Sequence, residues 1–379
     1  MERENTALVL TGGGSRAAYQ VGLLKAISQW QPRNAPLPFG IITGTSAGAI
    51  NGTTLACFAS CFALGVKKLE QVWSQFETGQ VYHADLARVS KHLLARLATL
   101  FQADYANPVP PSLLNPAPLR KLLSEVMDFP RIQGHINRGK LRALAVTASS
   151  YSSQRSVTFF AADDAHGPWQ RAKREGLRTH INEYHLLASA ALPLVFPSVR
   201  IKDQYFGDGT IHQLSPLSPA IHLGADRMLI FGMEEPKGTP LKTNRTPHHP
   251  TVGTIAGHLL DTIFTDSLNA DLERLTRINQ TLKLIPPDKR EDLSLKPIQT
   301  LMINPSQNLD MIAQRHYQRL PRAIRGLLRL LGVDEGSESS LLSYLLFEGP
   351  YCQELMALGY QDAQAHKESL LSFLDLPRR

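Results

Sequence analysis

The sequence predicts a doubly wound α/β fold, in which a mostly parallel central sheet carries helices on both faces and a mainly helical C-terminal region follows. Two strand–turn–helix units follow each other at the start of the 379-residue chain, and later segments again alternate between short apolar runs and helical periods. Hydrophobic residues make up 43% of the chain, which is enough for a large core. We place the α/β domain over residues 5–235 and the helical region, packing on it, over residues 236–379.

The first two units predict the topology. Each combines a buried strand, a glycine-containing turn and a helix of small or apolar residues. They comprise strand 7–10, turn 12–14 and helix 15–30, then strand 39–43, turn 44–48 and helix 49–64. Because strand–helix–strand crossovers are right-handed, we expect the two strands to be parallel. Both turns then leave the carboxyl edge of the sheet, where α/β proteins bind their ligands.

The rest of the chain continues the alternation of strands and helices. Residues 66–104 follow a helical period, and the proline-rich residues 107–118 are expected to form an irregular loop. The expected strands are 141–148, 156–161, 227–233 and 299–304, and the expected helices are 119–127, 183–191 and 251–282. Residues 236–250 are rich in Pro, Thr and His and predict a surface loop.

Charge and cysteine content limit the partners and the cellular compartment that we expect for the protein. The formal net charge is +7 and the isoelectric point about 9.3. We expect no nucleic-acid partner, because a nucleic-acid binder usually clusters its basic residues, but this excess can attract the protein to an anionic membrane. Three cysteines, Cys57, Cys61 and Cys352, are too few for a disulfide scaffold, and we expect the first two in the core. No apolar signal core follows Met1, so we expect the cytoplasm, with peripheral contact at the inner membrane face as an option.

The first turn contains three consecutive glycines, Gly12, Gly13 and Gly14. Glycines can expose successive backbone N–H groups, and at a helix N-terminus these groups attract negative charge. A phosphate, a dinucleotide or the oxyanion of acyl transfer can use such a turn. The loose dinucleotide pattern Gly-x-Gly-x-x-Ala is present, but it expects an acidic residue about 20 positions later. No Asp or Glu lies between Glu4 and Glu70, which counts against a nicotinamide cofactor.

The second turn, Gly44-Thr45-Ser46-Ala47-Gly48, has the Gly-x-Ser-x-Gly pattern of a nucleophile elbow. Small neighbours allow a tight backbone, and the following helix N-terminus stabilises developing negative charge. The pattern alone is weak, because a serine after glycine often only caps a helix. Its position after a strand, beside a second glycine-rich turn, favours a nucleophilic Ser46.

The group that accepts the proton of Ser46 has two candidates. An ordinary α/β-hydrolase supplies a histidine, and His212 is the best placed of the 13 histidines. Asp208 is the alternative, since Gly207 and Gly209 on either side let its backbone enter a crowded site. The same Gly-Asp-Gly pattern is also common in plain turns.

Taken together, these residues resemble the patatin-like phospholipase family, over about residues 5–235. That family combines a glycine-rich oxyanion loop, a Gly-x-Ser-x-Gly elbow about 30 residues later and a downstream Asp-Gly-Gly segment. The resemblance implies a lipid acyl hydrolase with a Ser46–Asp208 dyad, no histidine, no cofactor and no metal. It implies an oxyanion hole at Gly12, Gly13, Gly14 and Ser15, and substrate contacts at Arg16, Gly44, Thr45, Ala47, Gly48 and Gly209. Arg16 would face a phosphate headgroup, or else lie on a helix surface.

Two positions depart from the family pattern. Ala17 stands where a glycine is frequent, and Thr210 stands where Asp-Gly-Gly has its last glycine. A β-branched residue resists a positive φ, so Thr210 leaves open a silent module that binds acyl lipids without cleaving them. A nucleotide-binding oxidoreductase is the remaining alternative.

Two amphipathic segments offer contacts with lipid. Residues 90–101 can form a lid or a membrane-facing helix, and residues 315–331 are basic and rich in leucine. The competing interpretation of both is a core helix with a solvated basic face.

Overall fold

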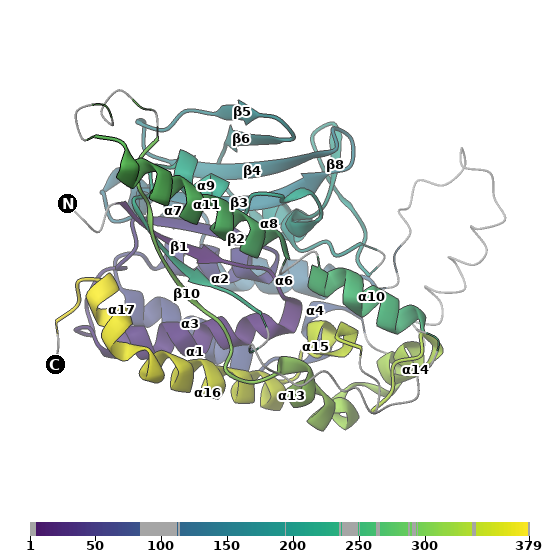
Figure 1. Cartoon of the computed structure of the whole chain (residues 1–379). Helices are drawn as coiled ribbons and strands as arrows, with labels where there is room; N and C mark the ends of the chain where they lie inside the picture. The colour runs from purple at the N-terminus through teal and green to yellow at the C-terminus, as the bar shows by residue number, and fades with distance from the viewer. Residues whose placement is uncertain are drawn as a thin grey trace.

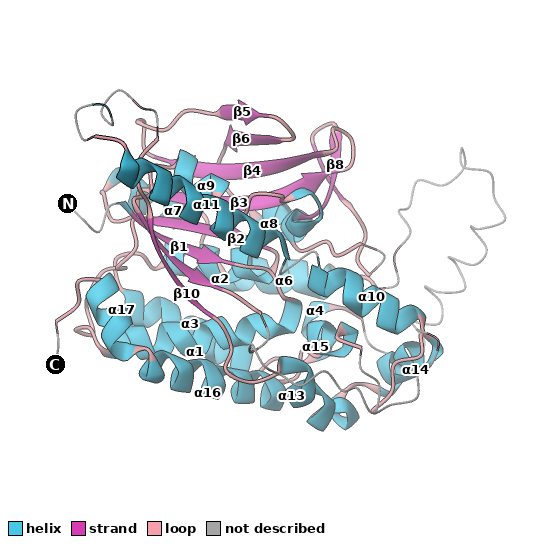
Figure 2. Ribbon diagram, in the orientation of Figure 1, coloured by secondary structure: helices cyan, strands magenta, loops and turns pink. Residues whose placement is uncertain are grey.

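The computed structural model describes residues 5–83, 112, 114–193, 195–234, 236, 249, 251–262, 266–286, 289, 293, 295–335 and 339–377. Its strands are β1 (Thr6–Leu10), β2 (Ile41–Thr45), β3 (Ala143–Ser150), β4 (Arg155–Ala162), β5 (Trp169–Arg171), β6 (Arg174–Arg178), β7 (Val199–Ile201), β8 (Gln204–Asp208), β9 (Arg227–Phe231) and β10 (Gln299–Ile303). They form one sheet with β10, β9, β1, β2, β3, β4, β6 and β5 in spatial order, and β8 pairs with β3 and β7. Figure 2 shows this sheet with helices on both sides.

The first 235 residues contribute the following helices. These are η2 (Gly14–Ala17), α1 (Ala18–Gln29), α2 (Ala47–Cys57), α3 (Phe62–Ser74), α4 (Thr78–Val81), α6 (Ala117–Val126), α7 (Pro130–Asn137), α8 (Glu183–Ser189), η4 (Gly209–His212) and α9 (Ser218–His222). The rest of the chain adds α10 (Val252–Asp261), α11 (Ser267–Leu284), α13 (Leu309–Arg315), η6 (Tyr317–Arg319), α14 (Arg322–Leu330), α15 (Leu341–Leu345), α16 (Gly349–Ala365) and α17 (Lys367–Phe373).

Strand direction follows the predicted topology. The four pairings from β10 through β9, β1 and β2 to β3 are all parallel, with Leu8 opposite Ile42 of β2 and Leu229 of β9. The pairings of β3 with β4 and with β8 are antiparallel. Parallel order brings the carboxyl ends of β1 and β2 to the same edge of the sheet, so both glycine-containing turns meet there.

Alternate residues of each central strand build two cores. In β1, Leu8 and Leu10 pack into the larger core with α1, α2, α3 and α16, whereas Ala7 and Val9 face α9 and α11. This is the alternation that a strand buried on both faces requires. Figure 1 shows α1 and α16 on one side of the sheet and α9 and α11 on the other. The doubly wound prediction is therefore confirmed.

The C-terminal region shares the sheet and the larger core with the N-terminal region. Its strand β10 lies beside β9, and its long helix α16 packs along α1. Two glycines bring these helices close, because a Cβ on Gly22 would lie 2.0 Å from the Met356 carbonyl oxygen and one on Gly359 would lie 2.1 Å from that of Tyr19. The boundary predicted near residue 235 thus separates segments that share one interior.

The helix predicted over residues 49–64 is broken. The segment 49–64 divides into α2 and α3, because Ala59 and Phe62 instead join the preceding loop: Leu37 N–H donates to Ala59 O, and Phe62 N–H donates to Ala35 O, each at 2.9 Å. This break leaves Cys61 half-exposed, so its expected place in the core is wrong, whereas Cys57 is buried. Within the segment 251–282, α10 and α11 are described, and residues 263–265 between them lie outside the described residues.

Several predictions concern residues outside the described part of the chain. The amphipathic segment 90–101 and most of the loop 236–250 lie there. Within the described residues, no helix is both long and apolar enough to cross a membrane.

Candidate active site

Ser46 occupies the sharp turn between β2 and α2, at the carboxyl edge of the sheet. Its backbone has φ 54° and ψ −131°, an unusual conformation for a residue with a side chain. Such strain persists only where the surroundings impose it, and it is a feature of nucleophile elbows. The turn places Ser46 directly before the N-terminus of α2, whose dipole favours negative charge.

Close packing imposes this turn. A Cβ on Gly44 would lie 2.6 Å from Ala49 Cα, and one on Gly48 would lie 2.4 Å from the Leu10 carbonyl oxygen. The backbone N–H of Ser46 donates to Ser189 Oγ at 2.8 Å, and that hydroxyl donates to Thr147 O at 2.6 Å. The two predicted glycines thus have a steric role, and Ser189 is a support that the sequence analysis did not assign.

Asp208 ends β8 and is completely buried. Its N–H donates to Ala191 O at 2.8 Å, and a Cβ on Gly209 would lie 2.1 Å from Thr147 O, so the backbone here is tightly enclosed. Its Oδ1 accepts hydrogen bonds from the backbone N–H and the hydroxyl of Thr210, at 3.0 and 2.7 Å.

The second carboxylate oxygen of Asp208, Oδ2, differs from Oδ1 in its hydrogen bonding. Oδ2 is buried and has no hydrogen bond of ordinary geometry within the described residues. Burial raises the pKa of Asp208 to about 6, while the Ser46 side chain and the two Thr210 donors oppose that rise by stabilising the ionised form. A buried carboxylate oxygen without a hydrogen bond has the capacity to accept a proton from a nearby hydroxyl.

Thr210 fits the site without the strain that its branched side chain suggested. It lies in η4, outside the residues with positive φ, and its hydroxyl adds a donor to Asp208 that glycine cannot supply. His212 follows on the same turn, but no hydrogen bond joins it to Ser46 within the described residues. Burial lowers the pKa of His212. The geometry therefore favours Asp208 over His212 as the partner of Ser46.

The glycine-rich turn faces Ser46 across a shared cavity. Gly14 has φ +55°, and a Cβ there would lie 2.3 Å from the Tyr344 carbonyl oxygen, so glycine is required. Within the described residues, the N–H groups of Gly13 and Gly14 donate to no protein acceptor. The Ser15 side chain instead donates to Ser343 O at 2.7 Å, which fixes the loop. Gly12 lies beside a separate small cavity with Thr45 and Thr210.

Arg16 does not face a headgroup, which corrects the expectation for this residue. Its guanidinium is buried and donates to Asp310 at 2.6 Å and Asp261 at 3.1 Å, and it stacks on the Tyr344 ring. Burial alone would lower the pKa of Arg16, but Tyr344, Asp310 and Asp261 raise it above its usual value. Arg16 therefore anchors the glycine-rich turn to the C-terminal region.

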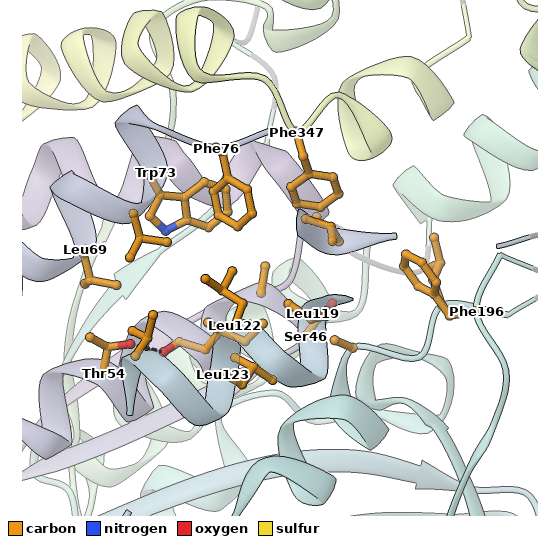
Figure 3. A pocket seen from close by; sticks show the side chains of 18 of the residues that line it. Ser46, Thr54, Leu69, Trp73, Phe76, Leu119, Leu122, Leu123, Phe196 and Phe347 are labelled. Atoms are coloured by element: carbon orange, nitrogen blue, oxygen red, sulfur yellow. Dashed lines mark hydrogen bonds between the residues drawn. The ribbon is translucent and has the colours of Figure 1, made fainter. Parts of the chain in front are cut away.

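A long apolar pocket opens from Ser46 (Figure 3). It is lined almost entirely by carbon. Its walls include residues from five parts of the chain: Ala47, Ile50 and Thr54 of α2; Leu69, Val72, Trp73 and Phe76 on or just after α3; Leu119, Leu122, Leu123 and Val126 of α6; Ala190, Leu192 and Phe196 after α8; and Tyr344, Leu345 and Phe347 near α15. Figure 3 shows Trp73, Phe76 and Phe347 on one side and the α6 leucines on the other. No local sequence signal marks these residues as one site.

On a doubly wound α/β fold, the site thus combines a serine elbow, a buried aspartate and an apolar pocket. A family model for the patatin-like phospholipases matches residues 8–221, which is more than half of the chain. The chain belongs to the patatin-like phospholipase family and is a lipid acyl hydrolase. Family membership removes the nucleotide-binding alternative.

Three solved structures that are similar to this chain are the following. VipD from Legionella pneumophila is 12% identical with a TM-score of 0.40, and the match covers 98% of this chain and 67% of that one. Human GIVD cytosolic phospholipase A2 is 11% identical with a TM-score of 0.43, covering 99% and 60%. ExoU from Pseudomonas aeruginosa, solved with SpcU, is 14% identical with a TM-score of 0.27, covering 97% and 78%. The chain therefore spans about three fifths of the human protein's length. A search of curated proteins found no match.

Proposed function

We propose that the chain cleaves fatty-acyl esters of lipids with a Ser46–Asp208 dyad. Ser46 Oγ attacks the ester carbonyl carbon while Asp208 Oδ2 accepts its proton. The N–H groups of Gly13 and Gly14 stabilise the oxyanion. The observation that carries this proposal is the orphaned, buried Oδ2 of Asp208 beside a strained serine at the mouth of an apolar pocket.

The second half of the reaction returns the enzyme to its starting state. Collapse of the first tetrahedral intermediate expels the alcohol, which takes the proton from Asp208, and leaves an acyl group on Ser46. Asp208 then accepts a proton from water as that water attacks the acyl carbon. The second collapse releases the fatty acid and returns the proton to Ser46 Oγ.

The pocket supports a substrate with one long saturated or unsaturated chain. Ala47, Ile50 and Thr54 line it along one face of α2, so it follows that helix for eight residues beyond Ser46, or about 12 Å. An extended chain of single bonds advances roughly 1.2 Å per bond, so about ten carbons fit beside this wall. We therefore propose phospholipids or lysophospholipids with medium or long chains, met at the surface of a membrane.

A chain-length series tests this proposal. Esters of one chromogenic alcohol with acyl chains of increasing length are hydrolysed by the wild-type protein and by Ser46→Ala. The proposal predicts that kcat/KM rises with chain length until the wall of α2 is filled and that Ser46→Ala is inactive throughout. A rate independent of chain length would contradict the role of the pocket, and an active Ser46→Ala variant would contradict the nucleophile.

A further inference from the structure

Helix α10 presents an apolar stripe to solvent. Val252 is 66% exposed, Ile255 is 49% exposed and Leu259 is 55% exposed, and their spacing of three and four residues places them on one side of the helix. No Lys, Arg, Asp or Glu occurs in the helix before Asp261. A helix at a water-facing surface ordinarily turns charged side chains outward, so this stripe is suited to contact something other than water.

The opposite side of α10 is fixed against the protein, so the helix cannot rotate to bury its stripe. The N–H of Gly253 donates to Leu331 O at 2.7 Å. A Cβ on Gly253 would lie 2.2 Å from Val333, and one on Gly257 would lie 2.9 Å from both Ser339 and Ser340. These two glycines let α10 pack closely against the end of α14 and the start of α15. Because this side of α10 is buried, the apolar stripe on the other side faces outward.

Helix α14 adds positive charge beside this stripe. Its buried side contains Ile324 and Leu328, while Arg322 and Arg329 are exposed and Leu330 is 83% exposed. The Thr251 hydroxyl, at the start of α10, donates to Gly332 O at 3.3 Å, so the end of α14 meets the start of α10. Figure 1 shows the two helices next to each other at one end of the molecule.

The charges around the two helices are mainly positive. Arg319 lies just before α14 and Arg325 lies within it, where it donates to Gln318. The acidic residues Asp334 and Glu335 follow Val333, and Gln318 also donates to Glu335. An apolar stripe with arginines at its border matches a surface that offers both acyl chains and negative headgroups.

We propose that the edge formed by Val252, Ile255 and Leu259 of α10 with Arg322, Arg329 and Leu330 of α14 docks the protein on an anionic lipid surface. The stripe enters the outer acyl region, and the arginines contact phosphate groups around it. The proposal rests on the proposed function, since it names the surface by which the hydrolase meets its substrate.

The docking edge is joined to the catalytic region through the other side of α10. Helix α15 packs on α10 and supplies Tyr344 and Leu345 to the acyl pocket. Asp261, the last residue of α10, accepts hydrogen bonds from Arg16 and Tyr344. Docking through α10 therefore places the pocket wall and the anchor of the glycine-rich turn next to the lipid surface.

Vesicle binding tests the proposal on the full chain. Each variant is made in a Ser46→Ala background, to prevent hydrolysis, and floated with vesicles of phosphatidylcholine alone or mixed equally with phosphatidylglycerol. We compare Ile255→Ser/Leu259→Ser with Leu284→Ser, and Arg322→Gln/Arg329→Gln with Arg33→Gln/Lys140→Gln. The control positions are exposed and lie away from the docking edge. Thermal unfolding confirms that each variant is folded, and hydrolysis of a short soluble ester is measured with Ser46 present.

The expected result is about tenfold weaker partitioning for Ile255→Ser/Leu259→Ser on the mixed vesicles. Arg322→Gln/Arg329→Gln should lose about tenfold, only on the mixed vesicles, and the controls should bind like the parent. Hydrolysis of the short ester should not change, so a failure of docking is distinguishable from a failure of the proposed function, which would abolish hydrolysis in every sample. Equal binding by all variants, or no binding by the parent, overturns the proposal. A dimer that dissociates in the α10 variant would overturn it in favour of a second copy of the chain.

Discussion

The guanidinium of Arg16 stacks on the ring of Tyr344, with 4.0 Å between Arg16 Cζ and the ring centre. Arg16 belongs to the glycine-rich turn, and Tyr344 lines the acyl pocket. The contact therefore joins the two halves of the site. Asp261 and Asp310, which hold the same guanidinium, come from helices α10 and α13 of the C-terminal region.

Replacement of Arg16 by Met should destabilise the protein strongly. The change leaves Asp261 and Asp310 without their buried cation, and removal of one partner from a buried ion pair costs about 3 to 5 kcal/mol. Urea unfolding measures this loss, with exposed Arg33→Met as the control. Hydrolysis should fall as well, because the glycine-rich turn loses its anchor. A stable, fully active Arg16→Met variant would show that the network has no structural role.

Replacement of Thr210 by Val should move the acidic limb of activity to higher pH. The active form has Asp208 ionised, and burial raises its pKa to about 6, so kcat/KM should fall below about pH 6. The Thr210 hydroxyl stabilises the ionised form, so its loss should raise that pKa by about one further unit. Thr210→Ser keeps the hydroxyl and should restore the wild-type profile. Identical pH profiles of kcat/KM for Thr210→Val and the wild type would contradict the role of the Thr210 hydroxyl.

Replacement of Asp208 by Asn should stabilise the folded protein at neutral pH while it abolishes activity. The pKa of Asp208 rises from 3.8 to about 6 on folding, so the folded state binds the proton more tightly than the unfolded state. Stability from this group is therefore lost as pH rises from about 4 to 6, by up to about 3 kcal/mol. The gain of Asp208→Asn should appear above pH 6 and vanish below pH 4. Urea unfolding at both pH values measures it, and a gain independent of pH would contradict the assigned cause.

Replacement of Thr54 by Trp should shorten the preferred acyl chain. Thr54 lies two turns along α2 from Ser46, and an indole there would close the far part of the pocket. Rates with long chains should fall at least about tenfold, and rates with short chains should not change. The matched control is Leu64→Trp, which alters an exposed position on α3. An unchanged chain-length profile would place the acyl chain elsewhere.

Local sequence signals were sufficient for the central part of the fold. Each strand–turn–helix unit is contiguous, and Gly44 and Gly48 mark a turn that needs small residues, so Ser46 could be placed on an elbow. The position of Asp208 could also be predicted, because the glycines on either side indicate a backbone that is closely surrounded by other atoms. The Gly-x-Ser-x-Gly pattern indicates a nucleophile because it lies between a strand and a helix, and the residue pattern alone does not.

The parts that could not be predicted depend on contacts between distant segments. Arg16 contacts Asp261 and Asp310, which lie 245 and 294 residues away, so nothing near Arg16 shows that it is buried. The apolar pocket combines three helices of the first half with Phe196 and with the segment 344–347. Apolar helix faces look alike in sequence whether they line a core or a cavity. The break after α2 likewise depends on hydrogen bonds from the loop at Ala35 and Leu37.

Covalent labelling tests directly whether Ser46 and Asp208 form a catalytic dyad. Wild type, Ser46→Ala and Asp208→Asn are treated with a long-chain fluorophosphonate, and the intact mass of each is measured over time. We expect one adduct on the wild type and none on Ser46→Ala. Labelling of Asp208→Asn should be slowed by about a hundredfold or more, because the proton acceptor is gone. An adduct on Ser46→Ala, or unchanged labelling of Asp208→Asn, would contradict the dyad.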